Sequence, residues 1–139
     1  MEVLYIIALL FLATASYAIA KHFKLKKLSL ERGDANICEY ARSFDYRVVD
    51  TKIMREVWNE VQQNLGNPNG KQFPIKADDL LEGTYNIDPD DLDEIYWKVA
   101  DRLGIDTRSP EENPLFNKVT SVRNLVMFLH HQPKKVHHA

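Results

Sequence analysis

The stretch DPDDLDEIYWKVADRLG, residues 88–104, decides the fold, because its apolar side chains recur every three or four residues, as on one face of an α-helix. Asp88 is a preferred N-cap residue type, and Pro89 at the first helical position loses no hydrogen bond. Gly104 is a natural C-cap. The pattern predicts an amphipathic helix whose inward side chains are Leu92, Ile95, Tyr96, Val99 and Leu103.

The segment before this helix carries a second amphipathic pattern. Residues 51–65 place an apolar side chain at every fourth position, with Thr51 as the expected N-cap and Gly66 as the stop. The inward side chains are Ile53, Val57, Val61 and Leu65, joined by Met54 and Trp58. Residues 66–87 form a loop that is long for a compact domain, so we expect it either to pack on the core or to serve the function.

The segment after residue 104 predicts one more helix. Residues 107–118 contain two prolines, so we expect at most a short turn or helix around 111–117. The last helix is expected to begin after Thr120 as N-cap and to end before Pro133. Its buried face is Val122, Leu125, Val126 and Leu129. Residues 133–139 read KKVHHA after the proline and predict a frayed polar tail.

The composition is that of one ordinary globular domain preceded by an apolar N-terminal segment. The chain has 139 residues, of which 45% are hydrophobic and 27% charged. Cys38 is the only cysteine, which excludes a disulfide framework. The formal charge of −2 argues against a general nucleic-acid binder. Since no alternating apolar run is long enough for a strand, residues 51–132 are expected to form a small all-α bundle.

The N-terminal segment has the composition of a transmembrane helix. Val3–Ala20, VLYIIALLFLATASYAIA, is an 18-residue run without a charge. As a helix it is about 27 Å long, which nearly spans a hydrocarbon core of roughly 30 Å. The basic residues that follow directly are Lys21, Lys24, Lys26 and Lys27. By the positive-inside rule, residues 1–20 are expected to be a single-pass anchor in the inner (cytoplasmic) membrane, with the C-terminal domain in the cytoplasm.

A cleaved signal peptide is the alternative interpretation of this segment. Ala18-Ile19-Ala20 resembles a small-x-small cleavage site. However, the basic n-region is missing, and the lysines follow the apolar run instead of preceding it. The anchor is therefore the favoured interpretation.

Residues 21–50 are expected to be a basic juxtamembrane linker followed by a short helix. The linker lysines either set the topology or lie against anionic headgroups, and we favour the first. Asp34 is the expected cap of a helix over residues 35–44. Its apolar stripe is Ile37, Tyr40, Ala41 and Phe44.

Motifs for catalysis and metal binding are missing from the sequence, which has no phosphate loop, no glycine-rich nucleotide fingerprint, no Gly-x-Ser-x-Gly and no Cys-x-x-Cys. Asp88, Asp90 and Asp93 superficially suggest calcium ligands, but the required sixth-position glycine is missing and a helix starts there. Adjacent histidines, His130-His131 and His137-His138, point about 100° apart on a helix, so one face holds only one of each pair. We expect neither an enzyme nor a metal protein.

A run of acidic residues surrounds the start of the helix at residue 88. Eight acids occur between positions 78 and 94 with no Lys or Arg among them: Asp78, Asp79, Glu82, Asp88, Asp90, Asp91, Asp93 and Glu94. Helix-start acids interact favourably with the helix dipole, but eight acids within 17 residues repel one another and attract a basic surface. We favour partner docking over a solvated face. The expected contact residues are Asp90, Asp91, Asp93 and Glu94, with Trp97 as an aromatic anchor if it is exposed. For Trp97 itself we slightly favour partial burial against the loop.

From about Thr51 to His131 the chain resembles an acyl carrier protein. The stretch DLDEI at residues 91–95 looks like the family's Asp-Ser-Leu-Asp-x-Val/Ile signature at the start of helix two. ADDLLE at 77–82 resembles the loop before it, and KVTSV at 118–122 resembles the Lys-Ile-Thr-Thr-Val entry to the final helix. The resemblance implies an acyl-carrier-like helical bundle in a membrane-anchored, bacterial carrier-like protein.

The chain departs from that family at its functional residue. The family's serine carries 4′-phosphopantetheine, and the position here is Asp91 or, in another register, Pro89. Neither side chain can form the phosphodiester. The resemblance therefore implies an interaction module without a prosthetic group, whose acids meet basic patches on acyl-transfer or lipid-related enzymes. The alternatives are a functioning carrier with an unusual attachment site, and a secreted binding module after signal cleavage.

Overall fold

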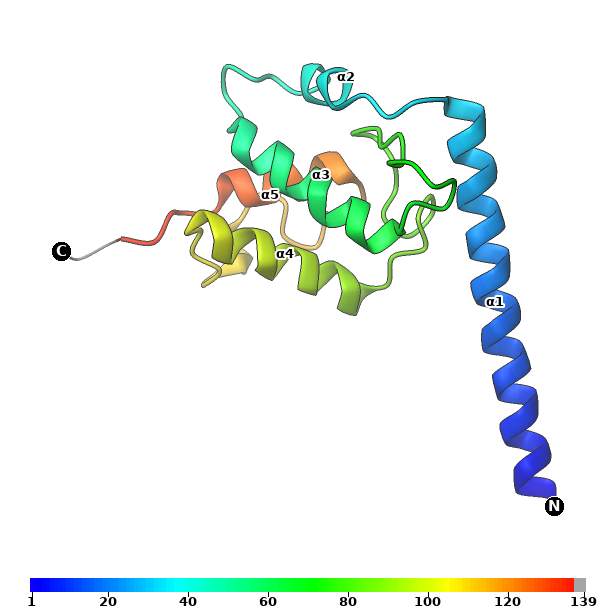
Figure 1. Cartoon of the computed structure of the whole chain (residues 1–139). Helices are drawn as coiled ribbons and strands as arrows, with labels where there is room; N and C mark the ends of the chain where they lie inside the picture. The colour runs from blue at the N-terminus through cyan, green and yellow to red at the C-terminus, as the bar shows by residue number, and fades with distance from the viewer. Residues whose placement is uncertain (137–139) are drawn as a thin grey trace.

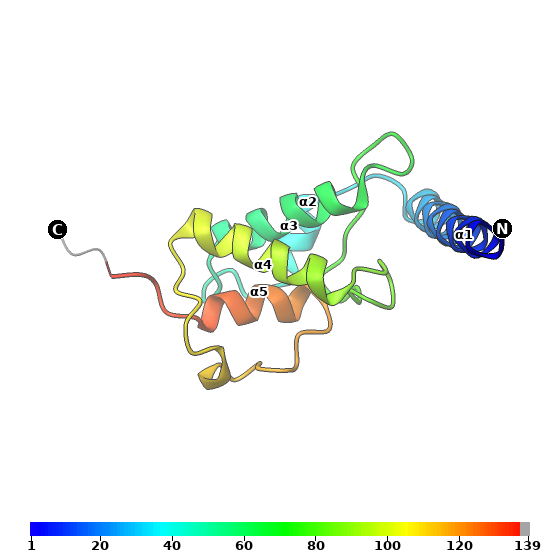
Figure 2. The same ribbon diagram turned by 90° about the horizontal axis from the view of Figure 1, so that it is seen from below.

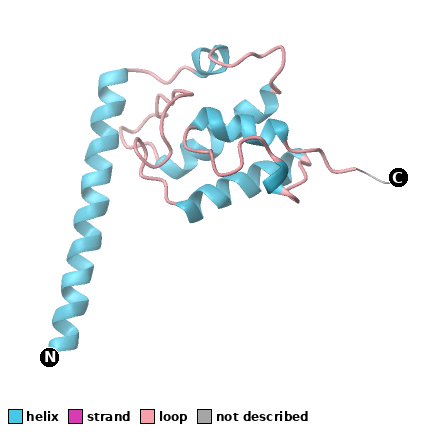
Figure 3. Cartoon of the chain, turned by 180° about the vertical axis from the view of Figure 1, so that it is seen from behind, coloured by secondary structure: helices cyan, strands magenta, loops and turns pink. Residues whose placement is uncertain are grey.

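The chain forms one long helix beside a small helical domain. The computed structural model describes residues 1–136. Its elements are α1 (Glu2–Arg32), α2 (Ile37–Arg42), α3 (Thr51–Leu65), α4 (Pro89–Leu103), a 3-10 helix η1 (Pro110–Glu112) and α5 (Val122–His131). Within residues 1–136 there is no strand, only two isolated antiparallel bridges, which join Leu80 to Ser121 and Ile105 to Lys134 (Figure 3). The predicted all-α class is confirmed.

The helix ends follow capping chemistry, with three shifts from expectation. Asp50, Ser121 and Asn36 are the N-caps of α3, α5 and α2, so the expected caps Thr51, Thr120 and Asp34 were wrong. Each observed cap has extended backbone and a side-chain oxygen that accepts from an N–H two or three residues on, at 2.9 to 3.1 Å. The shift is one residue for α3 and α5, because two good capping residues stand side by side there.

The predicted ends of α4 are confirmed. The Asp88 carboxylate accepts from the Asp91 N–H at 2.8 Å, and Pro89 opens the helix. Gly104 and Gly66 close α4 and α3 in the left-handed conformation, with φ of +65° and +71°.

Helices α3, α4 and α5 lie side by side around the core (Figure 2). Their fully buried side chains include Val57, Val61, Val99, Val122, Leu125, Val126 and Leu129. Most predicted inward positions are therefore buried. Leu92 is only half-buried, as are Tyr96 and Leu103, and the expectation of a mostly buried Leu92 was wrong. Leu92 lies in the first turn of α4, at the end of the helix, whereas the buried Ile95 and Val99 lie further along it.

The loop of residues 66–87 packs on the core. Phe73 and Tyr85 are fully buried, and their rings meet edge to face at 5.6 Å. The Gln62 side chain holds the loop to α3, since it accepts from the Phe73 N–H at 2.8 Å and donates to the Phe73 carbonyl at 2.6 Å. The length of the loop is thus explained by its packing on the core.

Helix α1 continues well past the apolar run. Residues 21–32, expected as a linker, are helical, and the helix ends at Gly33 with a φ of +82°. No glycine or proline interrupts the chain before that point, and the last turns pack on the domain through Leu25 and Ser29, each 3% exposed. The apolar part of α1 extends beyond the domain (Figure 1). It is long and apolar enough to cross a membrane, by length and composition.

Three smaller expectations need correction. The short helix over residues 35–44 is confined to Ile37–Arg42, with Tyr40 and Phe44 buried but Ile37 exposed. The turn expected around 111–117 is the 3-10 helix η1, one residue earlier, because Pro110 starts it. The beginning of the tail is held instead of frayed, since the Asp106 N–H donates to the Pro133 carbonyl at 2.7 Å. Residues 137–139, with His137 and His138, lie outside the described part of the chain.

Candidate docking face on α4

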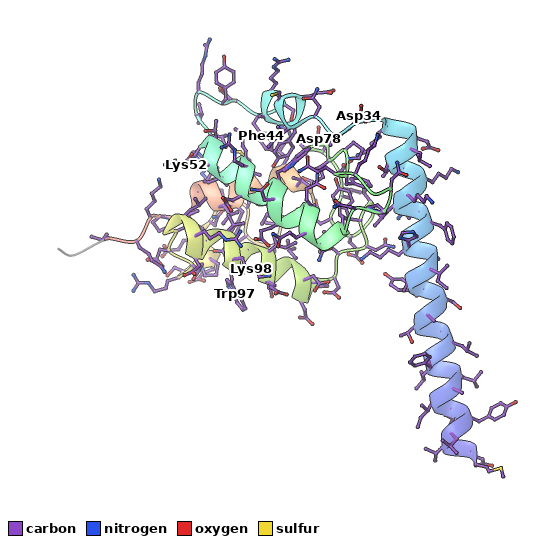
Figure 4. All side chains as sticks on the ribbon, in the orientation of Figure 1. Asp34, Phe44, Lys52, Asp78, Trp97 and Lys98 are labelled. Atoms are coloured by element: carbon purple, nitrogen blue, oxygen red, sulfur yellow. The ribbon has the colours of Figure 1, made fainter. Side chains whose placement is uncertain are left out.

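The candidate site is the outward face of α4. Asp90, Asp93, Glu94 and Trp97 are exposed, and Asp91 is half-buried. The Trp97 side chain is 61% exposed and points away from the rest of the domain, so the favoured partial burial against the loop was wrong (Figure 4). On the opposite side of the helix, Ile95 and Val99 lie in the core. The same helix therefore anchors the fold with one face and presents an indole among carboxylates with the other.

The eight acids do not form one continuous patch. Asp79 is buried, and Asp78 is paired with Arg123 at 2.7 Å. Asp88 is the N-cap of α4. Glu82 is exposed in the loop before α4. The acids of this run that lie within α4 are the four that follow Pro89.

Three of these four acids have no ion-pair partner within residues 1–136. Only Glu94 is paired, with Lys98 at 3.0 Å in an i,i+4 contact, which raises the pKa of Lys98. Both side chains are well exposed, so the pair adds little stability and leaves the field of the face negative. Asp90 and Asp91 lie in the first turn, where the helix dipole favours carboxylates.

The face has a fixed place relative to the apolar helix. The Lys21 ammonium, the first group after the apolar run, donates to the Asn86 carbonyl at 3.4 Å. Lys24 donates to the Gly83 carbonyl at 2.9 Å. Pro89 lies three positions after Asn86, a reach of at most about 11 Å, so α4 begins within that distance of the residue that Lys21 contacts.

An ion pair between Arg32 and Asp79 also holds α1 against the loop of residues 66–87. Two guanidinium nitrogens donate to the Asp79 carboxylate at 2.6 and 2.7 Å, and the Lys76 N–H donates to it at 2.9 Å. Tyr85 donates its hydroxyl to the same carboxylate. Burial and the Asp79 charge raise the pKa of Tyr85 above its ordinary range, so the hydroxyl stays protonated as a donor. Sequence reasoning placed Asp79 in the acidic cluster and missed this role.

A second charge network, in which only Glu60 is buried, lies between α3 and α4. Glu60 is 2% exposed and is paired with Arg102, which also contacts Glu56 at 3.2 Å. The pairing fixes α4 against α3 on the flank away from Trp97. The sequence carries no clear signal for this network, since α3 has only two acids and the partner of Glu60 lies 42 residues away.

Chemistry-bearing side chains are scattered elsewhere on the domain. Within residues 1–136, no group of three or more His, Cys, Asp and Glu side chains is arranged to hold a metal ion. His130 and His131 lie at the end of α5. The hollow beside Trp97 is shallow and open, and is lined by Lys98, Asp101, Ile105, Thr107 and Lys135.

Comparison of the chain with known protein families, with curated proteins and with solved structures finds no match.

Proposed function

We propose that this protein is a single-pass membrane protein whose cytoplasmic helical domain docks a basic protein partner through the outward face of α4. The observation that carries the proposal is that face itself, where Trp97 stands exposed among Asp90, Asp93 and Glu94. An exposed aromatic side chain supplies buried area in a complex, and surrounding charges speed the encounter. The role needs neither catalysis nor a prosthetic group.

The position of α4 narrows the class of partner. Because Lys21 and Lys24 hold the loop that leads into α4, the docking face lies next to the point where α1 would leave the bilayer. The cytoplasmic segments of membrane proteins are rich in Lys and Arg. The partner is therefore a membrane-bound or peripheral protein with a basic surface at the same membrane, of which acyl-transfer and lipid-related enzymes are the favoured class.

The likeness to acyl carrier proteins supports this choice of partner class. In that family the acids at the start of helix two meet basic patches, and the equivalent residues here start α4. The attachment position is Pro89 at the first helical position, or Asp91 in the first turn. Neither residue has a hydroxyl group.

We predict that the purified protein carries no phosphopantetheine. The intact mass from the native host should equal the mass of the polypeptide, because no hydroxyl lies at the attachment position. Treatment with a phosphopantetheinyl transferase should add nothing. A mass increase equal to the arm would instead favour the alternative, a functioning carrier with an unusual attachment site.

The topology is tested by a reporter fused after Ala139. The lysines after Ala20 predict that a reporter active only in the cytoplasm works at this position. Activity of a reporter that works only outside the cytoplasm would contradict the proposal. The mature N-terminus, read by mass spectrometry, tests the secreted alternative, which requires cleavage after Ala20.

Neutralising the face should weaken docking. The test variant changes Asp90, Asp91 and Asp93 to Asn and Glu94 to Gln. The salt concentration that releases the partner from membranes should then be lower for this variant than for wild type. The association rate should fall by a larger factor than the dissociation rate rises. The matched control neutralises four exposed acids elsewhere, namely Glu39, Asp45, Glu111 and Glu112, and should bind as wild type does. Equal binding by the two quadruple variants would contradict docking through α4.

A further inference from the structure

Helix α1 has an exposed apolar stripe outside the expected membrane span. Phe23 and Leu30 are 61% and 59% exposed. They are seven residues apart, so both lie on one face of the helix. Lys26, Lys27 and Glu31 line a hollow with them.

Lipid does not account for the exposure of Leu30. This residue lies ten positions beyond Ala20, about 15 Å along the helix at 1.5 Å per residue. The headgroup region on one side of a bilayer is only about 5–7 Å thick. If the apolar run spans the bilayer, Leu30 stands in water on a helix that the domain covers only on its other side.

The domain contacts the opposite face of α1. The residues that make those contacts are Lys21, Lys24, Leu25, Ser29 and Arg32. At 100° per residue, Leu25 lies about 200° from Phe23. A partner on the exposed stripe would therefore lie on the side of α1 that is turned away from the domain.

The stripe continues through the apolar run with a coiled-coil spacing. Two interleaved sets repeat every seven residues: Leu9, Ser16, Phe23 and Leu30 in one, and Ile6, Ala13, Ala20 and Lys27 in the other. Alternate steps of three and four residues are the pattern by which two helices pack along a shared seam.

The charges beside the stripe fit a parallel pair. Lys26 and Glu31 lie on opposite flanks of it, five residues apart, and neither forms an ion pair within residues 1–136. Five residues is the separation at which flanking charges of two parallel coiled-coil helices meet. Lys27 lies nearer the seam, where its stem can cover Leu30 while the ammonium reaches water.

We propose that α1 pairs with α1 of a second copy of this chain, in a parallel homodimer whose seam runs through Phe23 and Leu30. Anchoring in one membrane aligns the two helices and raises their effective concentration. The pairing is symmetric, and the two domains lie on the outer sides of the helix pair. Each α4 docking face stays free, so the dimer presents two of them to one membrane surface.

Disulfide cross-linking of the full chain in lipid vesicles tests the dimer. Cys38 is exposed and is first changed to Ala. Phe23→Cys and Leu30→Cys should each oxidise to a covalent dimer in most of the protein. His22→Cys is the control, because it is exposed at nearly the same depth but turned about 100° off the stripe, and should cross-link several-fold less. The proposal is overturned if His22→Cys cross-links as fully as Phe23→Cys, or if both stripe variants stay monomeric.

Charge reversal at the flanks of the seam tests the dimer without any cysteine substitution. Lys26→Glu should lower the dimer fraction of vesicle-bound protein several-fold by opposing Glu31 of the other copy, and Lys26→Glu with Glu31→Lys should restore it. A Lys26→Glu variant that dimerises as wild type does overturns the assigned charge pairing.

Discussion

Replacing Val57 by aspartate is expected to unfold the helical domain while the apolar part of α1 stays helical. Val57 lies in the middle of α3 and is fully buried. An unpaired carboxylate there costs several kcal/mol, a large share of the roughly 5–15 kcal/mol that stabilises a typical domain. Residues 2–20 of α1 are exposed and do not depend on that core.

Fluorescence of the buried Trp58 is the readout for this variant in detergent. Arg55→Asp is the control, since Arg55 is exposed on the same helix and its change should shift stability by about 0.5 kcal/mol or less. Leu125→Asp should behave as Val57→Asp does, whereas the half-buried Leu92 should tolerate aspartate better. Retention of the wild-type melting temperature by Val57→Asp would show that the assigned faces of α3 are wrong.

The second large effect is expected from Asp79→Ala. Its carboxylate is 7% exposed and accepts from Arg32, Tyr85 and the Lys76 N–H. Removing it leaves a largely buried guanidinium and a buried hydroxyl without an acceptor, which should cost about 3–5 kcal/mol. The last turns of α1 should also loosen from the loop.

Asp78→Ala is the matched control for Asp79→Ala. The Asp78 side chain is 80% exposed and pairs with Arg123 at the surface, so its loss should cost at most about 1 kcal/mol. Denaturant unfolding of both variants measures the difference. Equal losses would contradict a structural role for the buried pair.

The helical domain is largely predictable from local sequence. Apolar spacing and the two terminal glycines place α3 and α4 almost to the residue, because these signals act within a few positions of one another. The caps of α3 and α5 are missed by one residue, since Asp50-Thr51 and Thr120-Ser121 each offer two good candidates. Only backbone geometry chooses between them.

The interactions that attach the domain to α1 cannot be predicted from local sequence. Arg32 and Asp79 are 47 residues apart, and the sequence shows one as a linker residue and the other as one acid among eight. Folding brings them together, and it turns the supposed linker into the end of a long helix. Likewise, Trp97 adjoins the apolar stripe of α4, and only the packing of α4 on the domain leaves it exposed.

The most direct test of docking through α4 is photo-cross-linking in native membranes. A photoreactive residue in place of Trp97 should form a discrete adduct with one protein, through a peptide rich in Lys and Arg. The same residue in place of Tyr46, an aromatic side chain that is also 61% exposed, should not. Neutralising Asp90, Asp91, Asp93 and Glu94 should abolish the adduct at position 97. Identical products from positions 97 and 46, or none from position 97, would contradict the proposed docking face.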